Sequence, residues 1–242
     1  MHEAGYIPIT VSLLNWNPPL ARWFTILNLR LNGAEFHEAL MRGEESYEDT
    51  RVRAVFEHWA EMLAHNCFPE NQLIGYGAAA NQIYDGEAAM YNLGEWLSES
   101  YSDGLPDTFD FFNFPILTPD LPQAEIVHIY GAFMLSNAQN PPAARDFLAF
   151  LGSANSQTTR KDALNQLVLN LDVDHSTYSP VYQKGLQFVS DAERMTQLFE
   201  FNTHPDIART GLTEFARFYT NPATIDLVMA NLEAAWLEQY GE

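Results

Sequence analysis

Two tryptophans stand beside polar side chains where a strand is expected to give way to a helix. Trp16 lies between Asn15 and Asn17, and Trp96 directly follows Glu95. In α/β proteins, ligand sites form in the loops at the carboxyl ends of strands. An aromatic face next to amide or carboxylate groups suits a sugar, whose C–H groups pack on the ring while its hydroxyls bond to the polar groups. A core position explains each tryptophan equally well.

Three other patterns could bind a metal ion or a cofactor, and each has a simpler explanation. His58, Glu61 and His65 share one helix face and could ligate a divalent metal, but a solvated polar face is the stronger interpretation. Asp172–His175 lacks the turn glycine and closing glutamate of a calcium loop. Gly75–Ala80 fits G-x-G-x-x-A, but the preceding apolar run is too short for the strand of a dinucleotide site. We therefore expect no metal and no cofactor.

Catalytic motifs are missing from the sequence. There is no G-x-S-x-G elbow and no P-loop. A glycosidase needs two carboxylates at a defined separation, which sequence does not show. The single cysteine, Cys67, excludes an internal disulfide and is expected to be a small buried hydrophobe. We expect no catalytic residues and no enzyme activity, with an acidic hydrolase as the weakest alternative.

The composition excludes some partners and predicts a folded chain. Hydrophobic residues make up 47% and charged residues 18% of 242 residues, which is enough to build a core. Asp and Glu number 32 against 12 Lys and Arg, giving a net charge of −20 that disfavours nucleic acid. No run approaches the roughly 20 apolar residues of a membrane helix. The first residues do not form a secretory signal, so the chain as written is expected to be soluble and to carry no export signal.

Short apolar runs predict strands, and helix-period patterns between them predict helices. The expected strands cover residues 6–14, 88–91, 109–114 and 125–136. The expected helices cover residues 19–32, 50–65, 75–84, 141–151 and 155–164, with an almost entirely helical region from residue 180 to the end. Gly33 is expected to stop the first helix, and Asn221 to cap the last one. Strands alternating with helices indicate an α/β fold.

Three stretches resemble one family and occur in its order. Residues 86–96 read GEAAMYNLGEW and resemble its G-x-A-A-M-x-x-x-G-x-W segment. Residues 110–115 read DFFNFP and resemble its D-F-F-x-F-P segment. Residues 140–157 fit its N-x-x-A-A-x-x-F-L-x-x-L-x-S-x-x-x-Q helix pair, and residues 3–9 look like its A-G-Y-x-P-I passage. The family is the extracellular solute-binding proteins of ABC transporters for sugars.

The resemblance implies a type II periplasmic-binding-protein-like α/β fold, here truncated and with a helix-rich C-terminal half. Members have two lobes, and the chain resembles only their later part. By analogy, residues 1–115 and 180–242 form the second lobe. Residues 125–178 are then the returning segment of an incomplete first lobe.

The resemblance also implies the function and the ligand-binding residues. The expected function is that of a carbohydrate-binding component, or fragment, of an ABC import system. It would bind a mono- or oligosaccharide in an inter-lobe cleft, work with an ABC permease, and lie outside the cytoplasm. Trp96 matches the motif tryptophan that stacks on sugar, with Glu95 beside it. Trp16, Tyr130 and Gly131 match segments that face the cleft.

A second function follows from the missing part of the first lobe. A strand over residues 125–136 without its sheet would expose backbone groups and the apolar side chains of Ile126, Val127, Ile129, Phe133 and Leu135. We therefore expect self-association through residues 125–178. The alternative function is a stand-alone or oligomeric interaction module that has lost transport.

Overall fold

The structure is a computed structural model that divides into two compact units. It describes residues 1–14, 18–69, 74–101, 106, 108–128, 131–164 and 166–241, apart from the side chains of His2 and Glu99. Unit 1 comprises Met1–Leu93, Asn113–Val127 and Asp191–Glu242. Unit 2 comprises Gly94–Phe112 and His128–Ser190.

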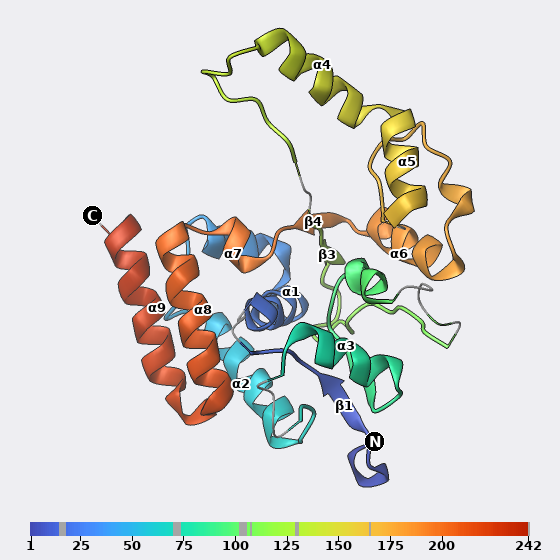
Figure 1. The fold of residues 1–242 in the computed structure, drawn as a ribbon. Coiled ribbons are helices and arrows are strands. Elements are labelled where there is room, and N and C mark those ends of the chain that lie inside the picture. Colours follow the sequence, from blue (N-terminus) through green and yellow to red (C-terminus); the bar gives the residue numbers. More distant parts are fainter. Residues whose placement is uncertain are drawn as a thin grey trace. The chain divides into compact units, whose positions relative to one another are not determined.

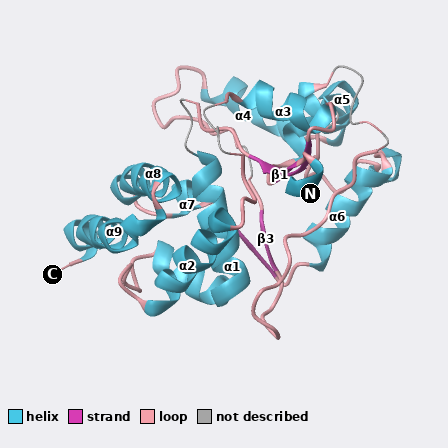
Figure 2. Cartoon of the chain, turned by 90° about the horizontal axis from the view of Figure 1, so that it is seen from below, coloured by secondary structure: helices cyan, strands magenta, loops and turns pink. Residues whose placement is uncertain are grey.

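Unit 1 is built mainly from helices that pack around α1. Its helices are α1 (Pro18–Met41), α2 (Thr50–Ala64), α3 (Tyr76–Tyr84), α7 (Phe199–Asn202), α8 (Pro205–Thr220) and α9 (Ile225–Tyr240), with short 3-10 helices η1 (His2–Ala4) and η4 (Pro222–Thr224). Helices α8 and α9 lie side by side (Figures 1 and 2). Phe24, Phe56, Trp59, Phe215 and Phe218 are fully buried between α1, α2 and α8. This aromatic cluster is the core of unit 1.

Two pairs of short parallel strands complete unit 1. Strand β1 (Ile7–Thr10) pairs with β2 (Ala88–Tyr91), and β3 (Ala124–Ile126) pairs with β4 (Arg194–Thr196). The expected strand at residues 88–91 is confirmed, and the one at 6–14 is shortened. β4 lies in the region expected to be helical.

Two strand predictions were wrong over most of their length. Residues 109–114 form no strand. Among the described residues of 125–136, which exclude 129 and 130, only the first two belong to a strand, β3, beside Ala124. A strand needs a hydrogen-bonding neighbour, and β-propensity alone does not supply one. Phe112, Phe133 and Leu135 are instead exposed, by 57%, 82% and 61%.

Gly33 interrupts α1, as expected, but the helix resumes after it. Its φ of 81° and ψ of 169° are not helical, and the positive φ favours glycine. The chain then continues as helix to Met41. Residues 19–30 are buried on all sides of α1, so this segment lacks the polar face of a surface helix.

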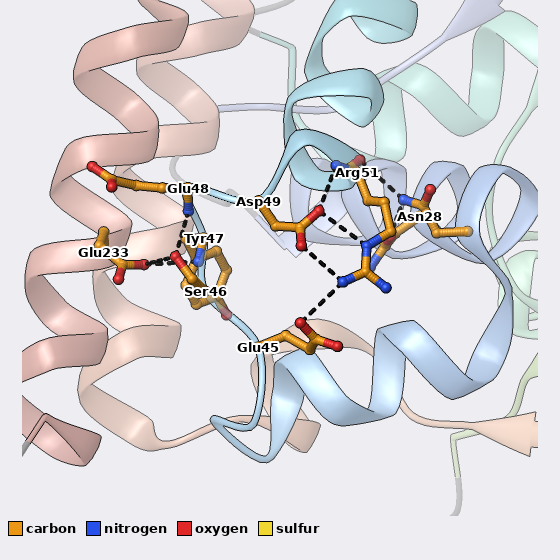
Figure 3. A network of polar contacts seen from close by, with 9 residues as sticks. Asn28, Glu45, Ser46, Tyr47, Glu48, Asp49, Arg51 and Glu233 are labelled. Carbon is orange, nitrogen blue, oxygen red and sulfur yellow. Dashed lines mark hydrogen bonds and ion pairs between the residues drawn. The ribbon is translucent and has the colours of Figure 1, made fainter.

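The loop before α2 is held by a network of polar contacts (Figure 3). Asp49 caps α2 by accepting from Arg51 N, and the Arg51 guanidinium donates to Asp49 and Glu45. Glu233 of α9 accepts from Ser46 Oγ and Tyr47 N, each at 2.8 Å. The predicted helix over residues 50–65 is thus confirmed, and it ends at Ala64. Asn221 caps η4 rather than α9, since it accepts from Ala223 N and α9 begins at Ile225.

Unit 2 consists of helices and loops in its described part. It contains η2 (Glu95–Ser100), α4 (Pro141–Gly152), α5 (Ala154–Leu164), η3 (His175–Thr177) and most of α6 (Pro180–Asp191). Asn140 caps α4 through Ala143 N. Lys161 is buried to 8% exposure, donates to the Asp174 carbonyl and Thr177 Oγ1, and so ties η3 to α5. No helix among the described residues has the length and apolar character to cross a membrane.

We expect the stability of the protein to fall as the pH is lowered, because His37 is buried in its neutral form. His37 is fully buried, and its Nδ1 accepts from Asn28 Nδ2 at 3.0 Å. Burial lowers its pKa from 6.5 to about 4, so between these values the unfolded chain binds more protons than the folded one. Within that window, the free energy of unfolding should drop by about 1.4 kcal/mol for each unit by which the pH is lowered. Urea unfolding of the wild type and His37→Gln at pH 7 and 4.5 measures this loss of stability. If both proteins lose the same amount between the two pH values, groups other than His37 cause the loss.

Candidate functional site

Polar side chains gather at the carboxyl ends of β1 and β2 in unit 1. The strands are parallel, with Thr10 opposite Tyr91, so both end at the same edge. Thr10 Oγ1 donates to Gln82 Oε1 at 2.6 Å. Ser12 Oγ and Tyr91 Oη share a hydrogen bond of 2.9 Å. Strand ends of this kind are where α/β proteins place ligand sites.

Arg22 reaches this edge from α1. It lies near the start of α1, is only 7% exposed, and donates from Nη1 to the Asn92 carbonyl at 3.5 Å. Burial raises the pKa of Tyr91, and the Arg22 charge opposes that rise. Burial likewise raises the pKa of Glu200, again opposed by Arg22. We call Ser12, Arg22, Tyr91, Asn92 and Glu200 the Arg22 cluster.

Two atoms of the Arg22 cluster are buried without a hydrogen-bond partner among the described residues. They are Glu200 Oε2, an acceptor, and Asn92 Nδ2, a donor. Buried polar atoms are paired in the great majority of cases. Each atom is therefore an open hydrogen-bonding position, an acceptor on α7 and a donor directly after β2.

Unit 2 places Glu95 and Trp96 at the start of η2. Glu95 is exposed and Trp96 half-buried. The Trp96 indole lies so close to Gly94 that a Cβ there would overlap the ring. Tyr182 of α6 donates from Oη to the Glu95 carbonyl at 3.2 Å and also contacts Ser98 Oγ. Gly94 therefore leaves room for the indole, and the hydrogen bond from Tyr182 holds the start of η2 in place.

Replacing Gly94 with alanine should move the Trp96 indole while leaving the fold intact. The added Cβ would occupy the volume of the ring, and Gly94 has an ordinary extended backbone (φ −92°) that alanine also adopts. We expect the tryptophan fluorescence spectrum to shift with little change in Tm. Gly77→Ala is the matched control, because nothing lies within 4 Å of a Cβ there. An unchanged spectrum in Gly94→Ala would show that the indole does not pack on Gly94.

The structure places three of the five expected ligand-binding residues. Glu95, Trp96 and Gly131 belong to unit 2, and Gly131 is exposed. Trp16 and Tyr130 lie outside the described residues.

The sequence did not lead us to predict the Arg22 cluster, although one motif contains two of its residues. Tyr91 and Asn92 fall inside the motif of residues 86–96. Arg22 and Glu200 carry no local signal, since they are far apart in the chain and each is an ordinary helix residue.

The other candidate patterns have structural explanations. His58 Nδ1 lies 3.6 Å from Glu61 Oε2, and the described part of the chain contains no group of three His, Cys, Asp or Glu side chains arranged to hold a metal. Asp174 caps η3 by accepting from Ser176 N. Gly75 is the residue before α3, as expected for a helix that begins after a glycine turn.

Comparison with known proteins gives a consistent result. A family model described as bacterial extracellular solute-binding protein matches residues 14–158. An uncharacterized ABC transporter extracellular-binding protein from Pyrococcus horikoshii is 24% identical over 196 residues. That alignment covers 80% of this chain and 43% of the relative, so the chain spans less than half the length of this curated relative.

Solved structures show the same fold over nearly the whole chain. The bacterial solute receptor AcbH, described as preferring β-D-galactopyranose, is 23% identical with a TM-score of 0.83. A chitin oligosaccharide binding protein is 16% identical with a TM-score of 0.81. These alignments cover 100% and 98% of this chain but 63% and 61% of the two structures. The fold is therefore the type II solute-binding α/β fold, as expected from the sequence, over about three-fifths of its usual length.

Proposed function

Because the chain belongs to the bacterial extracellular solute-binding protein family, we propose that it is a carbohydrate-binding component, or a piece of one, of an ABC import system. The match over residues 14–158 carries this proposal, since it includes β2, η2 and Trp96. Solved structures with the same fold are described as binding galactopyranose and chitin oligosaccharides. The ligand class is a neutral mono- or oligosaccharide.

The ligand-binding residues have separate roles within this proposal. Trp96 offers an aromatic face for the C–H groups of a sugar, and the exposed Glu95 offers a hydrogen-bond acceptor. We propose Trp16, Tyr130 and Gly131 as further ligand-binding residues on the basis of the family resemblance.

The family description also supports the location and the partner. Its members are extracellular, so the function belongs outside the cytoplasm, with an ABC permease receiving the sugar. A transport receptor must release its ligand unchanged, and so we propose binding without catalysis. We also propose that residues 1–115 and 180–242 correspond to the second lobe, and residues 125–178 to the returning part of the first.

A thermal-shift screen tests the proposed function. A ligand that binds only the folded state raises Tm with concentration. The screen uses galactose, xylo-oligosaccharides and chitin oligosaccharides at millimolar concentration on the full chain. A dose-dependent rise with at least one sugar that is lost in Trp96→Ala supports the proposal. No rise with any sugar would remove its main support, and hydrolysis of a sugar would favour an enzyme instead.

A second candidate function, self-association, is favoured by the apolar surface of unit 2. Helix α4 has no buried residue, and Phe147 and Phe150 are 58% and 52% exposed with their rings 6.4 Å apart. Phe133 and Leu135 are also exposed. A second copy would cover these side chains through residues 125–178. Light scattering at micromolar concentration should then give a dimer or larger species that Phe147→Asp converts to monomer, and a monomeric wild type would contradict this candidate.

A further inference from the structure

We propose that Tyr182 is a positioning residue for the proposed sugar site, because its phenol holds η2 so that the Trp96 indole keeps one orientation. Tyr182 lies on α6, outside both the motif of residues 86–96 and the family match over residues 14–158. Its effect on sugar affinity rests on the proposed function, whereas its effect on the indole follows from contacts within unit 2.

Helix η2 needs support from outside its own residues. It is a 3-10 helix of six residues, and the hydrogen bonds of this helix type have poorer geometry than those of an α-helix. Gly94 is its N-cap, and no described side chain caps its first turn. Among the residues of η2 whose side chains the structure describes, only Ser98 is buried. The orientation of Trp96 therefore depends on contacts that another element makes with η2.

The Tyr182 hydroxyl makes such contacts at two points of η2. It donates to the Glu95 carbonyl at 3.2 Å and also contacts Ser98 Oγ. The Ser98 hydroxyl can donate back to the phenol oxygen, since each hydroxyl both donates and accepts. Tyr182 is 3% and Ser98 4% exposed, so water competes little for these bonds. One hydroxyl group thus fixes two residues that stand on either side of Trp96 in the sequence.

Tyr182 is itself held in place by its neighbours in unit 2. Its ring stacks on Tyr178 with 5.8 Å between centroids and 21° between planes. Tyr178 Oη donates to the Gln166 carbonyl at 2.7 Å and accepts from Val168 N at 3.2 Å. The side chain of Gln183, next on α6, donates to the Tyr178 carbonyl at 2.8 Å. The hydroxyl that contacts η2 therefore has a fixed position.

A fixed indole should strengthen sugar binding, because less conformational freedom is lost when the ligand binds. Gly94 leaves the volume that the ring occupies, and Tyr182 keeps η2 from turning the ring away from it. Tyr182 is buried and bonds to the backbone of η2, so it acts through Trp96 and not by touching the sugar.

The test compares two substitutions that each delete one buried phenol hydroxyl. Tyr182→Phe keeps the ring that stacks on Tyr178 and loses the bonds to η2. Tyr178→Phe is the matched control, because Tyr178 is 5% exposed and its hydroxyl bonds to residues 166 and 168 instead of η2. Each substitution is made in the wild type and in Trp96→Ala. Circular dichroism and Tm verify folding, tryptophan emission reports on the indole, and calorimetry with the sugars of the thermal-shift screen gives dissociation constants.

We expect Tyr182→Phe to shift the tryptophan emission and to raise the dissociation constant about three- to tenfold. Both changes should disappear in Trp96→Ala, because a residue that acts through Trp96 has no effect once Trp96 is gone. Tyr178→Phe should lower Tm by a similar amount with little change in emission or affinity, since it keeps the ring on which Tyr182 stacks. Equal changes in the two hydroxyl deletions, or changes that persist in Trp96→Ala, would overturn the positioning role.

The remaining outcomes separate this role from the proposed function. Sugar bound equally well by the wild type and Tyr182→Phe would overturn the role of Tyr182 and leave the proposed function standing. If the wild type binds no sugar, the proposed function fails and the effect on affinity with it, while an unchanged emission in Tyr182→Phe would also overturn the effect on the indole. If Tyr182→Phe does not fold, Ser98→Ala deletes the other partner of the phenol and should shift the emission, and an unshifted spectrum would then overturn the proposal.

Discussion

Phe215→Ala should destabilise the protein by about 4 kcal/mol, the largest effect that we expect from a single core substitution. The ring is fully buried and stacks on Phe24 at 4.7 Å between centroids. It also contacts Phe199 at 5.0 Å and Phe56 at 6.1 Å. Truncation removes these contacts and leaves a cavity between α1, α2, α7 and α8. The surrounding rings are too rigid to fill it by changing rotamer, so little of the loss is recovered.

Urea unfolding at pH 7 measures this loss. Phe112→Ala is the matched control, because it deletes the same atoms from a side chain that is 57% exposed. The control should change the midpoint little. Equal effects of the two substitutions would mean that the aromatic cluster does not hold unit 1 together.

Arg30→Met should cost about 3–5 kcal/mol, because it leaves buried acceptors unpaired. The Arg30 side chain is 2% exposed and contacts both the loop at Phe114 and strand β3. Its Nε donates to the Phe114 carbonyl at 2.8 Å, its Nη1 to the Ala124 carbonyl, and its Nη2 to Glu125 at 2.8 Å. The Arg30 carbonyl in turn accepts from the backbone of residues 117 and 118. Arg30 therefore holds the segment of residues 113–127 on α1.

Two further variants separate the charge of Arg30 from its geometry. Arg30→Lys keeps the charge but lacks the planar fork of donors, so we expect it to recover only part of the stability. Arg209→Met removes an arginine that is 73% exposed and should change the midpoint little. Hydrogen exchange should show faster exchange for residues 113–127 in Arg30→Met than in Arg209→Met. Full stability in Arg30→Lys would show that only the charge matters.

Local signals in the sequence were sufficient to predict the helices that have one apolar face and a capping residue. Helix α2 has Asp49 as its cap and buries Val52, Val55, Phe56 and Trp59. The helical period selects these four and Leu63, which is half-buried. Helix α4 likewise begins after Asn140 as predicted. These features depend on residues within one or two turns of each other, so the sequence displays them directly.

Features that depend on distant partners were not predictable in the same way. The apolar runs at residues 109–114 and 125–136 have strand composition, but strands form only where a neighbour supplies hydrogen bonds. β4 has three residues and exists through its pairing with β3, about seventy positions earlier. Helix α1 resumes after Gly33 because a glycine with positive φ redirects the chain without ending the helical region. The Arg22 cluster depends in the same way on tertiary packing, since α7 brings Glu200 to α1.

The motif around Trp96 was informative because its residues are consecutive. Gly94 permits the close approach of the indole, and both residues belong to the same short stretch of sequence. The anchoring of η2 by Tyr182 lies outside that stretch and needed the structure.

Calorimetric titration of the wild type and Trp96→Ala with galactose, xylotriose and chitotriose tests whether the chain binds a neutral sugar through Trp96. The wild type should bind at least one of these sugars saturably. The affinity should be at least about tenfold lower in Trp96→Ala, because the aromatic face is lost while the fold is kept. Trp236→Phe, on α9 in unit 1, serves as the control for tryptophan content and should bind like the wild type. No binding of any of the three sugars, or binding that is unchanged in Trp96→Ala, would show that Trp96 does not form a sugar site.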